Sequence, residues 1–282
     1  FLHLDHIDPA ILAERLPGIT ETGKIFAGVD LTRQPLPVVP TVHYNMGGIP
    51  TNYHGEVLNP TRDDPDHVVP GLMAIGEAAC VSVHGANRLG TNSLLDIVVF
   101  GRAAAQRAVE IVTPGAAQKP LPPAVEEAAL ARLDRIRNAV GRLKSGAVRL
   151  SMQRVMQSDC AVFRTRETLE EGVRKITDVA GSMSDLGLSD RSMSWNTDLM
   201  EALELDNLVA QAVVTLHSAV NRTECRGSHA RADFPDRDDV AWMKHSVVWL
   251  AGDGKVTIGY RPVHAYTLSN EVQPFPPKAR VY

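Results

Sequence analysis

The sequence predicts an α+β protein of several domains, in which a mixed α/β region precedes an antiparallel helical bundle and a small β-containing unit. Three observations predict this fold class. Short apolar runs separated by Gly, Pro, Asn and Asp occupy residues 41–79. From Ser93 to Val220, apolar residues recur at helical spacing. Beyond them, two strand-like runs flank the Gly-Asp-Gly sequence of residues 252–254, which is typical of a hairpin turn.

Length and composition limit the classes of protein to consider. The chain has 282 residues, of which 44% are hydrophobic and 22% charged, and its net charge is −4. These values are typical of a globular protein with more than one domain, and without a basic excess no nucleic acid partner is expected. The apolar runs are too short to predict a membrane-spanning helix. Cys80, Cys160 and Cys225 lack metal-ligand spacing, so we expect packed thiols and no metal site.

The N-terminal region predicts a strand, a short helix and a domain boundary. Residues 1–7 alternate apolar and polar side chains without an initiator Met, so we expect residue 1 to be a break in a longer chain. Asp8 and Pro9 have the form of an N-cap and a first-turn proline, and the helix should end before Pro17. Three prolines within residues 34–40 predict an extended crossing between structural units, so we expect a domain boundary near this segment.

The central region predicts helices. A helix beginning at Ser93 is apolar on nearly all sides and should be buried. After a linker at residues 113–123, four amphipathic helices should form an antiparallel bundle, the third opened by a capping box of Thr168 and Glu171 and the fourth capped by Asn196. Their apolar stripes are Leu130, Leu133, Ile136 and Val140; Val148, Met152, Val155 and Met156; Leu169, Val173, Ile176 and Val179; and Leu199, Leu203, Val209, Val213, Leu216 and Val220.

Three clusters, at residues 41–49, 71–79 and 84–94, join glycines to an ionisable side chain. In the first, His43 precedes Gly47 and Gly48, which allow close approach of a backbone or a flat ligand. His43 is a candidate to bind a carboxylate, and the alternative is a core histidine beside a simple turn. In the second, Glu77 follows an apolar strand and is a candidate acceptor for cofactor hydroxyl groups. The alternative there is an acid that faces solvent.

The third cluster places Arg88 in a loop rich in Gly and Asn, just before a helix. A guanidinium group can bind a carboxylate through two parallel hydrogen bonds. Free N–H groups near Ser93 and Leu94, at the positive end of the helix dipole, could stabilise negative charge on a cofactor. The alternatives are that Asn92 or Ser93 only caps the helix and that Arg88 only pairs with Asp96. The chain contains no G-x-G-x-x-G, so the dinucleotide-binding fingerprint is absent from it.

Taken with further motifs, these clusters resemble one protein family. The motifs are Phe1-Leu-His-Leu-Asp-His, Glu14-Arg-Leu-Pro-Gly, His43-Tyr-Asn-Met-Gly-Gly-Ile, Gly85-Ala-Asn-Arg-Leu-Gly, Arg226-Gly-Ser-His-Ala-Arg231, Asp233-Phe-Pro-Asp-Arg-Asp-Asp239, Trp242-Met-Lys-His and Pro277-Lys-Ala-Arg-Val-Tyr282. In this order they resemble the flavoproteins of succinate dehydrogenase and fumarate reductase over essentially the whole chain. The related L-aspartate oxidases are disfavoured, because their first motif usually has Thr-Cys where this chain has Asn45-Met46.

The resemblance implies roles for individual residues. It implies that His43 and Arg88 bind the dicarboxylate substrate, and that Glu77, Ser93 and Leu94 contact FAD. The family's catalytic Arg, its flavin-linking His and its glycine-rich turn would all lie upstream of residue 1. This chain would then hold no catalytic residue and be inactive alone. The basic group Arg226, His229 and Arg231 would have a structural or interface role, and His84 would lie near the flavin or serve packing.

The resemblance also implies a domain order. Residues 1–38 would end a capping domain, 39–112 would be the C-terminal part of the FAD-binding domain, 121–225 the helical bundle and 226–282 a small C-terminal domain. The whole protein would oxidise succinate to fumarate and pass electrons from FAD to an iron-sulfur subunit and quinone. It would be held, through membrane anchor subunits, peripherally on the cytoplasmic face of a bacterial inner membrane or the matrix face of a mitochondrial one. The alternatives are a fumarate reductase flavoprotein and a non-catalytic binding module.

Overall fold

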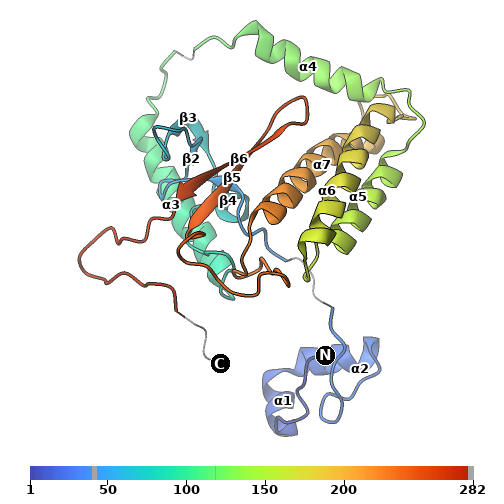
Figure 1. The fold of residues 1–282 in the computed structure, drawn as a ribbon, viewed down its shortest axis with the longest axis vertical. Helices are drawn as coiled ribbons and strands as arrows, with labels where there is room; N and C mark the ends of the chain where they lie inside the picture. The colour runs from blue at the N-terminus through green and yellow to red at the C-terminus, as the bar shows by residue number, and fades with distance from the viewer. Residues whose placement is uncertain (40–42, 118, 279–282) are drawn as a thin grey trace. The chain divides into compact units, whose positions relative to one another are not determined.

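The structure, a computed structural model, describes residues 1–39, 43–117 and 119–278. The chain forms two compact units, Phe1–Tyr44 and Asn45–Tyr282, and each is described by itself. Figure 1 shows the elements of both units in chain order. The predicted strand-like run at residues 41–44 lies partly outside the described residues, and its described part is not a strand.

The first unit is a pair of short helices. Helix α1 spans Pro9–Arg15, and the predicted cap is confirmed, because Asp8 accepts a hydrogen bond of 2.7 Å from the Ala10 N–H. Helix α2, Pro17–Phe26, was not predicted; Leu16 ends the first helix and begins the second, and Pro17 takes the first-turn position where its missing N–H is harmless. The predicted strand at residues 1–7 is wrong, since only an isolated bridge joins Leu2 to Leu36.

Small sheets begin the second unit. Strand β1, Ile49–Pro50, pairs in parallel with β4, Ala79–Cys80. Strand β2, Glu56–Leu58, pairs in antiparallel fashion with β3, Val68–Met73. The strand expected to run to Gly76 therefore ends earlier. A single 3-10 turn, η1, follows at Gly76–Ala78 and carries Glu77.

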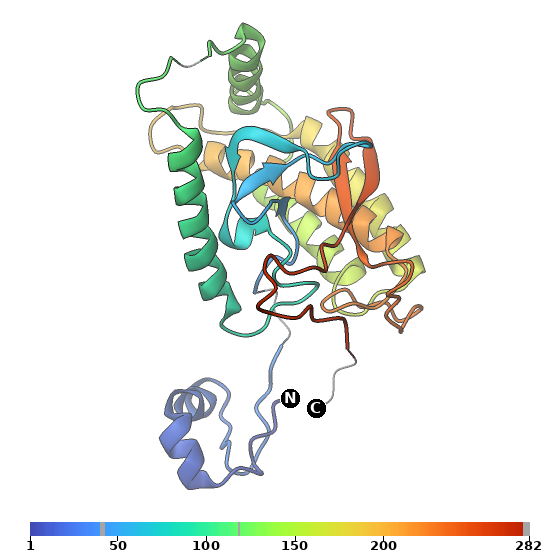
Figure 2. The same cartoon turned by 90° about the vertical axis from the view of Figure 1, so that its left-hand side faces the viewer.

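Helix α3, Asn92–Ile111, follows the third cluster and begins one residue before the predicted start. The prediction that it would be buried is wrong for the described chain, because Asp96 is its one buried residue while Leu94 and Val98 are 67% and 70% exposed. Figure 2 shows α3 at the edge of the second unit. The apolar composition predicted a helix, but it could not show which other segments would cover that helix. Among the described residues, no segment covers the Leu94 and Val98 side chains.

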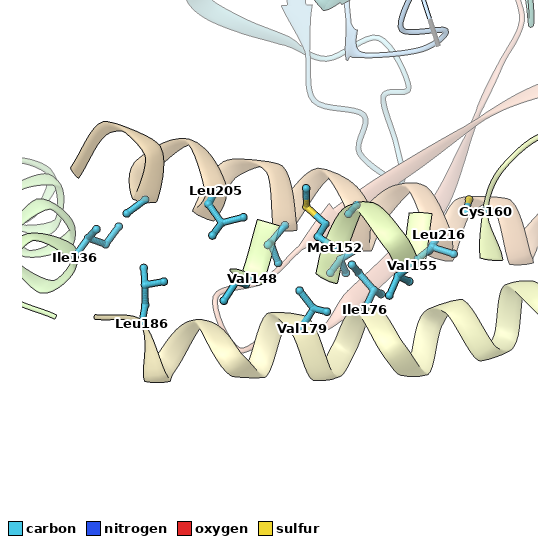
Figure 3. Close-up of a cluster of buried hydrophobic side chains, with 14 of the residues drawn as sticks. Ile136, Val148, Met152, Val155, Cys160, Ile176, Val179, Leu186, Leu205 and Leu216 are labelled. Atoms are coloured by element: carbon cyan, nitrogen blue, oxygen red, sulfur yellow. The ribbon is translucent and has the colours of Figure 1, made fainter. Parts of the chain in front are cut away.

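The helical bundle is confirmed. Helices α5, Ser145–Asp159, α6, Arg166–Ser182, and α7, Thr197–Asn221, pack around one core. Figure 3 shows α6 running opposite to α5 and α7, with side chains from all three between them. The turn η2, Met183–Asp185, extends the end of α6. The fully covered members of this core are Leu169, Ile176, Ala202, Leu205 and Leu216.

The remaining bundle helix, α4, spans Pro123–Arg137 and contributes less than predicted. Of its stripe, Ile136 is buried in the shared core, whereas Leu130 and Val140 are exposed. Arg132 adds a hydrogen bond of 2.8 Å to Asp206 of α7. Helix α4 therefore joins the bundle mainly through its C-terminal end.

Helix caps and the final hairpin complete the fold. The capping box of α6 consists of Thr165 and Thr168, so the predicted box starting at Thr168 is wrong by one turn. Asn196 caps α7 as predicted and accepts the Leu199 N–H at 2.8 Å. Strands β5, Lys244–Leu250, and β6, Val256–Pro262, form the predicted hairpin, with Gly254 at φ 83° in its turn.

Candidate functional site

Arg88 lies in the loop between β4 and α3, and its side chain is half-buried. Its Nη1 donates a hydrogen bond of 3.1 Å to Oγ of Ser93, in the first turn of α3. The helix N-cap is Thr91, which has φ 69° and no capping side-chain hydrogen bond. Neither Asn92 nor Ser93 is therefore the cap, and Ser93 orients the Arg88 guanidinium, so the capping alternative is wrong.

His84, from the same loop, and Asp96, from α3, form a largely buried pair. The Nε2–H of His84 donates to Oδ2 of Asp96 at 2.9 Å, and the two side chains are 11% and 2% exposed. A hydrogen bond to a buried carboxylate is among the stronger kinds available to a protein. The pair ties the start of the Arg88 loop to the second turn of α3. This contact holds the His84 ring against α3, and a place near the flavin stays a prediction.

Glu77 is held by the segment that carries the first glycine cluster. Its Oε1 accepts the Asn45 N–H at 3.0 Å. Gly48 has φ +114°, and a Cβ atom there would lie 2.5 Å from the carbonyl oxygen of Ala78. Only glycine allows this contact, so the close approach anticipated at Gly48 is made by the backbone of the Glu77 turn. Glu77 remains exposed and keeps a second carboxylate oxygen for other partners.

The site residues predicted from sequence fall into both compact units. His43 lies at the end of the first, whereas Glu77, Arg88, Ser93 and Leu94 lie in the second. Within the second unit, Arg88, Ser93 and Leu94 form one loop–helix junction. The expected free N–H at Leu94 is wrong, because it donates to the Thr91 carbonyl at 3.0 Å. The roles of all five in binding remain predictions.

The residues of the second unit fit a cofactor such as FAD in their chemistry. Glu77 offers an exposed carboxylate that can accept hydrogen bonds from hydroxyl groups. Leu89 and Leu94 are exposed apolar side chains near the positive end of α3, which suits a flat ring that bears negative charge. Among the described residues, no group of His, Cys, Asp and Glu is arranged to hold a metal ion.

The C-terminal region also contacts the Arg88 loop. The N–H and Oγ–H of Ser228 both donate to the Ala86 carbonyl, at 3.1 Å and 2.8 Å. At the start of the loop, Oγ of Ser82 and Nε2 of His245 lie 2.9 Å apart and share a hydrogen bond. These contacts were missed from sequence because the partners are 142 and 163 positions apart. No local sequence motif predicts these contacts.

The basic group of the C-terminal region, for which a structural or interface role was predicted, contacts other parts of this chain. Arg231 is buried and donates to the carbonyls of Ala219 and Val220 at the end of α7. Arg226 binds Glu224, whose carboxylate is fully covered. Burial alone would raise the pKa of Glu224, but the hydrogen bonds that it accepts from Arg226, the Asp238 backbone and Arg222 outweigh burial and lower it.

Comparisons with known proteins show the class of protein to which the chain is similar. Residues 1–94 match the model of the FAD binding domain, and residues 149–282 match that of the fumarate reductase flavoprotein C-terminal region. The chain is 61% identical to the mitochondrial succinate dehydrogenase flavoprotein subunit of rice (Oryza sativa subsp. japonica) and 55% identical to the succinate dehydrogenase flavoprotein subunit of Rickettsia felis. Both alignments cover all of this chain, and they cover 45% of the rice subunit and 47% of the Rickettsia felis subunit.

Solved structures agree with these matches. An Escherichia coli quinol fumarate reductase superposes with a TM-score of 0.80 at 34% identity, over 97% of this chain and 45% of the other. This chain belongs to the family of succinate dehydrogenase and fumarate reductase flavoproteins, and it spans about half the length of the relatives it matches. FAD is thereby confirmed as the cofactor of the family to which the chain belongs.

Proposed function

We propose that this chain forms part of the flavoprotein subunit of a succinate dehydrogenase, which oxidises succinate to fumarate. The observation that carries the proposal is the Arg88 guanidinium, fixed to Ser93 at the start of α3. The 61% and 55% identical relatives, each named a succinate dehydrogenase flavoprotein subunit, support the choice of substrate.

In this proposal Arg88 and His43 bind the two carboxylates of the substrate. A guanidinium fork can hold a carboxylate through two bonds, and its hydrogen bond to Ser93 reduces the side-chain entropy that binding would otherwise cost. His43 supplies a second donor. Binding at both ends would select dicarboxylates over monocarboxylates, because a monocarboxylate leaves one of the donors unmatched.

Glu77, Ser93 and Leu94 contact FAD in this proposal, with Glu77 accepting hydrogen bonds from hydroxyl groups. When bound, FAD supplies the acceptor for a hydride from succinate. The residues of this chain bind and orient the substrate. By the resemblance, an arginine outside this chain would remove the proton from the neighbouring carbon. A histidine outside this chain would attach the flavin covalently. Electrons would leave through an iron-sulfur subunit to quinone.

The assembly and location of the whole protein follow from the same proposal. The iron-sulfur subunit would dock on this flavoprotein, and membrane anchor subunits would hold both peripherally on the cytoplasmic or matrix face of the membrane. Among the described helices, none combines the length and apolar character needed for a membrane crossing. Attachment through partner subunits is consistent with that observation.

Fumarate reduction is the second candidate. It is favoured by the structural match to the E. coli quinol fumarate reductase and by a 36% identical E. coli fumarate reductase flavoprotein subunit. The same residues would serve both directions, because direction depends on redox potentials and quinone partners. The higher identities to succinate dehydrogenase subunits favour oxidation of succinate.

Replacing Arg88 with Lys in the full-length subunit tests the proposal. Lysine keeps the charge but loses the fork, so kcat/KM for succinate-driven dye reduction should fall about tenfold or more. Arg142→Lys is the matched control, because Arg142 is exposed and pairs with Asp185 in the bundle region. If both variants keep normal turnover, Arg88 does not bind the substrate.

A further inference from the structure

A short turn of the C-terminal region is built against the loop that carries Arg88. The turn spans residues 226–229 and is closed by hydrogen bonds between Arg226 and His229. Ser228 at its tip makes two hydrogen bonds to one acceptor, the Ala86 carbonyl, through its backbone N–H at 3.1 Å and its Oγ–H at 2.8 Å. Ala86 lies two positions before Arg88 in the sequence.

Gly227 makes the approach of the two backbones possible. Its φ is +58°, and a Cβ atom there would lie 2.6 Å from both the carbonyl carbon and the oxygen of Ala86. No real Cβ tolerates that distance to backbone atoms, so any other residue would push the turn and the loop apart. The contact is therefore backbone against backbone, with little room for adjustment.

The turn itself is anchored at both ends. Arg226 forms two hydrogen bonds to the fully covered carboxylate of Glu224 and one of 2.8 Å to Asp239. His229 accepts a hydrogen bond from Arg164 at Nδ1 and donates from Nε2 to the Arg222 carbonyl at 2.9 Å. Burial is the main cause that lowers the pKa of His229. The hydrogen bond to the Arg222 carbonyl opposes it, and the charges of Arg164 and Arg222 add to the lowering.

We propose that Ser228 is a positioning residue for Arg88, because it fixes the Ala86 carbonyl and with it the loop that presents the guanidinium to the substrate. This inference rests on the proposed function. Before Arg88, the loop is held by the hydrogen bonds that Ser228 donates to the Ala86 carbonyl. After it, the loop is held by the hydrogen bond that Arg88 donates to Ser93. Displacements of about 1 Å in a binding group cost substantial affinity or rate, so two fixed points have a functional consequence.

The test uses calorimetry to measure how tightly the full-length, flavin-loaded subunit binds malonate, which is a dicarboxylate. Ser228→Ala removes one of the two hydrogen bonds, so the dissociation constant should rise about threefold to tenfold. Ser228→Thr keeps the hydroxyl at an exposed position and should restore affinity to within about twofold. Trp249→Phe is the control, because it removes a different long-range bond, from Nε1 to Oδ1 of Asn59 at 3.0 Å, and should leave affinity unchanged.

A double-mutant cycle separates positioning from general stability. If Ser228 acts through Arg88, Ser228→Ala should change malonate affinity less than twofold in an Arg88→Ala background, which is a loss of additivity. An unchanged affinity for Ser228→Ala alone, or its full effect in the Arg88→Ala background, would overturn the inference while leaving the proposed function intact. An Arg88→Ala variant with normal malonate affinity would overturn both.

Discussion

Arg231 grips Asp233 through two hydrogen bonds, from Nε to Oδ1 at 2.8 Å and from Nη2 to Oδ2 at 2.7 Å. The guanidinium is buried and also donates to carbonyls at the end of α7, which have no partner within the helix. The hydrogen bonds from Arg231 are the main cause that lowers the pKa of Asp233 to about 2. One buried cation therefore joins the last turn of the bundle to the C-terminal region.

Arg231→Ala should destabilise the fold severely. It leaves the α7 carbonyls without these donors and Asp233, whose side chain is 27% exposed, without its ion-pair partner, which should cost about 2–3 kcal/mol. Arg237→Ala removes a similar two-bond contact, to Asp239 at a more exposed position, and should cost about 1 kcal/mol or less. Urea unfolding monitored by circular dichroism measures both, and equal losses would contradict the assigned role of Arg231.

Gly172 is a packing position in α6 that should not accept a side chain. A Cβ atom there would lie 2.9 Å from both Asp159 of α5 and Leu216 of α7. Gly172→Ala should therefore lower the free energy of unfolding by about 1–3 kcal/mol. Gly181→Ala in the same helix meets nothing within 4 Å and should be neutral or stabilising by up to about 1 kcal/mol. Thermal unfolding that ranks the two variants in the opposite order would refute this packing.

His245 should make stability depend on pH. Burial first, and then the charges of Arg261, Arg222 and His264, lower its pKa from 6.5 to about 4. Between these values the unfolded chain binds a proton that the folded chain excludes, so stability is full above pH 6.5 and falls as the pH drops toward 4. His245→Gln should remove this part of the decline, which amounts to about 3 kcal/mol at most.

The measurement is the unfolding free energy of the His245→Gln variant and of the unaltered protein at several pH values across that window. His3→Gln is the matched control, because the His3 side chain is 66% exposed. Parallel curves for the unaltered protein and the His245→Gln variant would show that His245 does not take up a proton on unfolding.

The 282-residue chain purified alone should be inactive. It spans about 45% of its relatives and contains no G-x-G-x-x-G sequence to hold the dinucleotide. We expect no covalently attached flavin and no succinate-driven dye reduction. Flavin fluorescence of the denatured protein and a dye assay check both, with a full-length subunit as the positive control. Either activity in the isolated chain would contradict this expectation.

Much of the fold could be predicted from local sequence. The Asp8 and Asn196 caps, the bundle stripes and the Gly254 hairpin depend on spacings that local physics determines. Burial was harder to predict. Helix α3 was predicted to be buried because its residues are apolar on nearly all sides. Burial depends instead on which other segments cover the helix, and the spacing of its own residues does not show that.

The candidate site shows the same division. Arg88, Ser93 and Glu77 were found from motifs, because each lies beside glycines or a helix start. The contacts of Ser228 with Ala86 and of His245 with Ser82 join residues far apart in the sequence, so they depend on tertiary packing alone. Even the alternative in which Ser93 only capped the helix could be rejected only once the Arg88–Ser93 hydrogen bond was seen.

The most direct test of the central claim is the affinity of the full-length, flavin-loaded subunit for malonate with and without Arg88. Loss of a charged donor that binds a carboxylate costs about 2–3 kcal/mol, so Arg88→Ala should raise the dissociation constant about 30-fold or more. The variant should bind FAD normally, which its absorption spectrum will show. An Arg88→Ala subunit that retains its flavin and binds malonate as tightly as the unaltered protein would contradict the account.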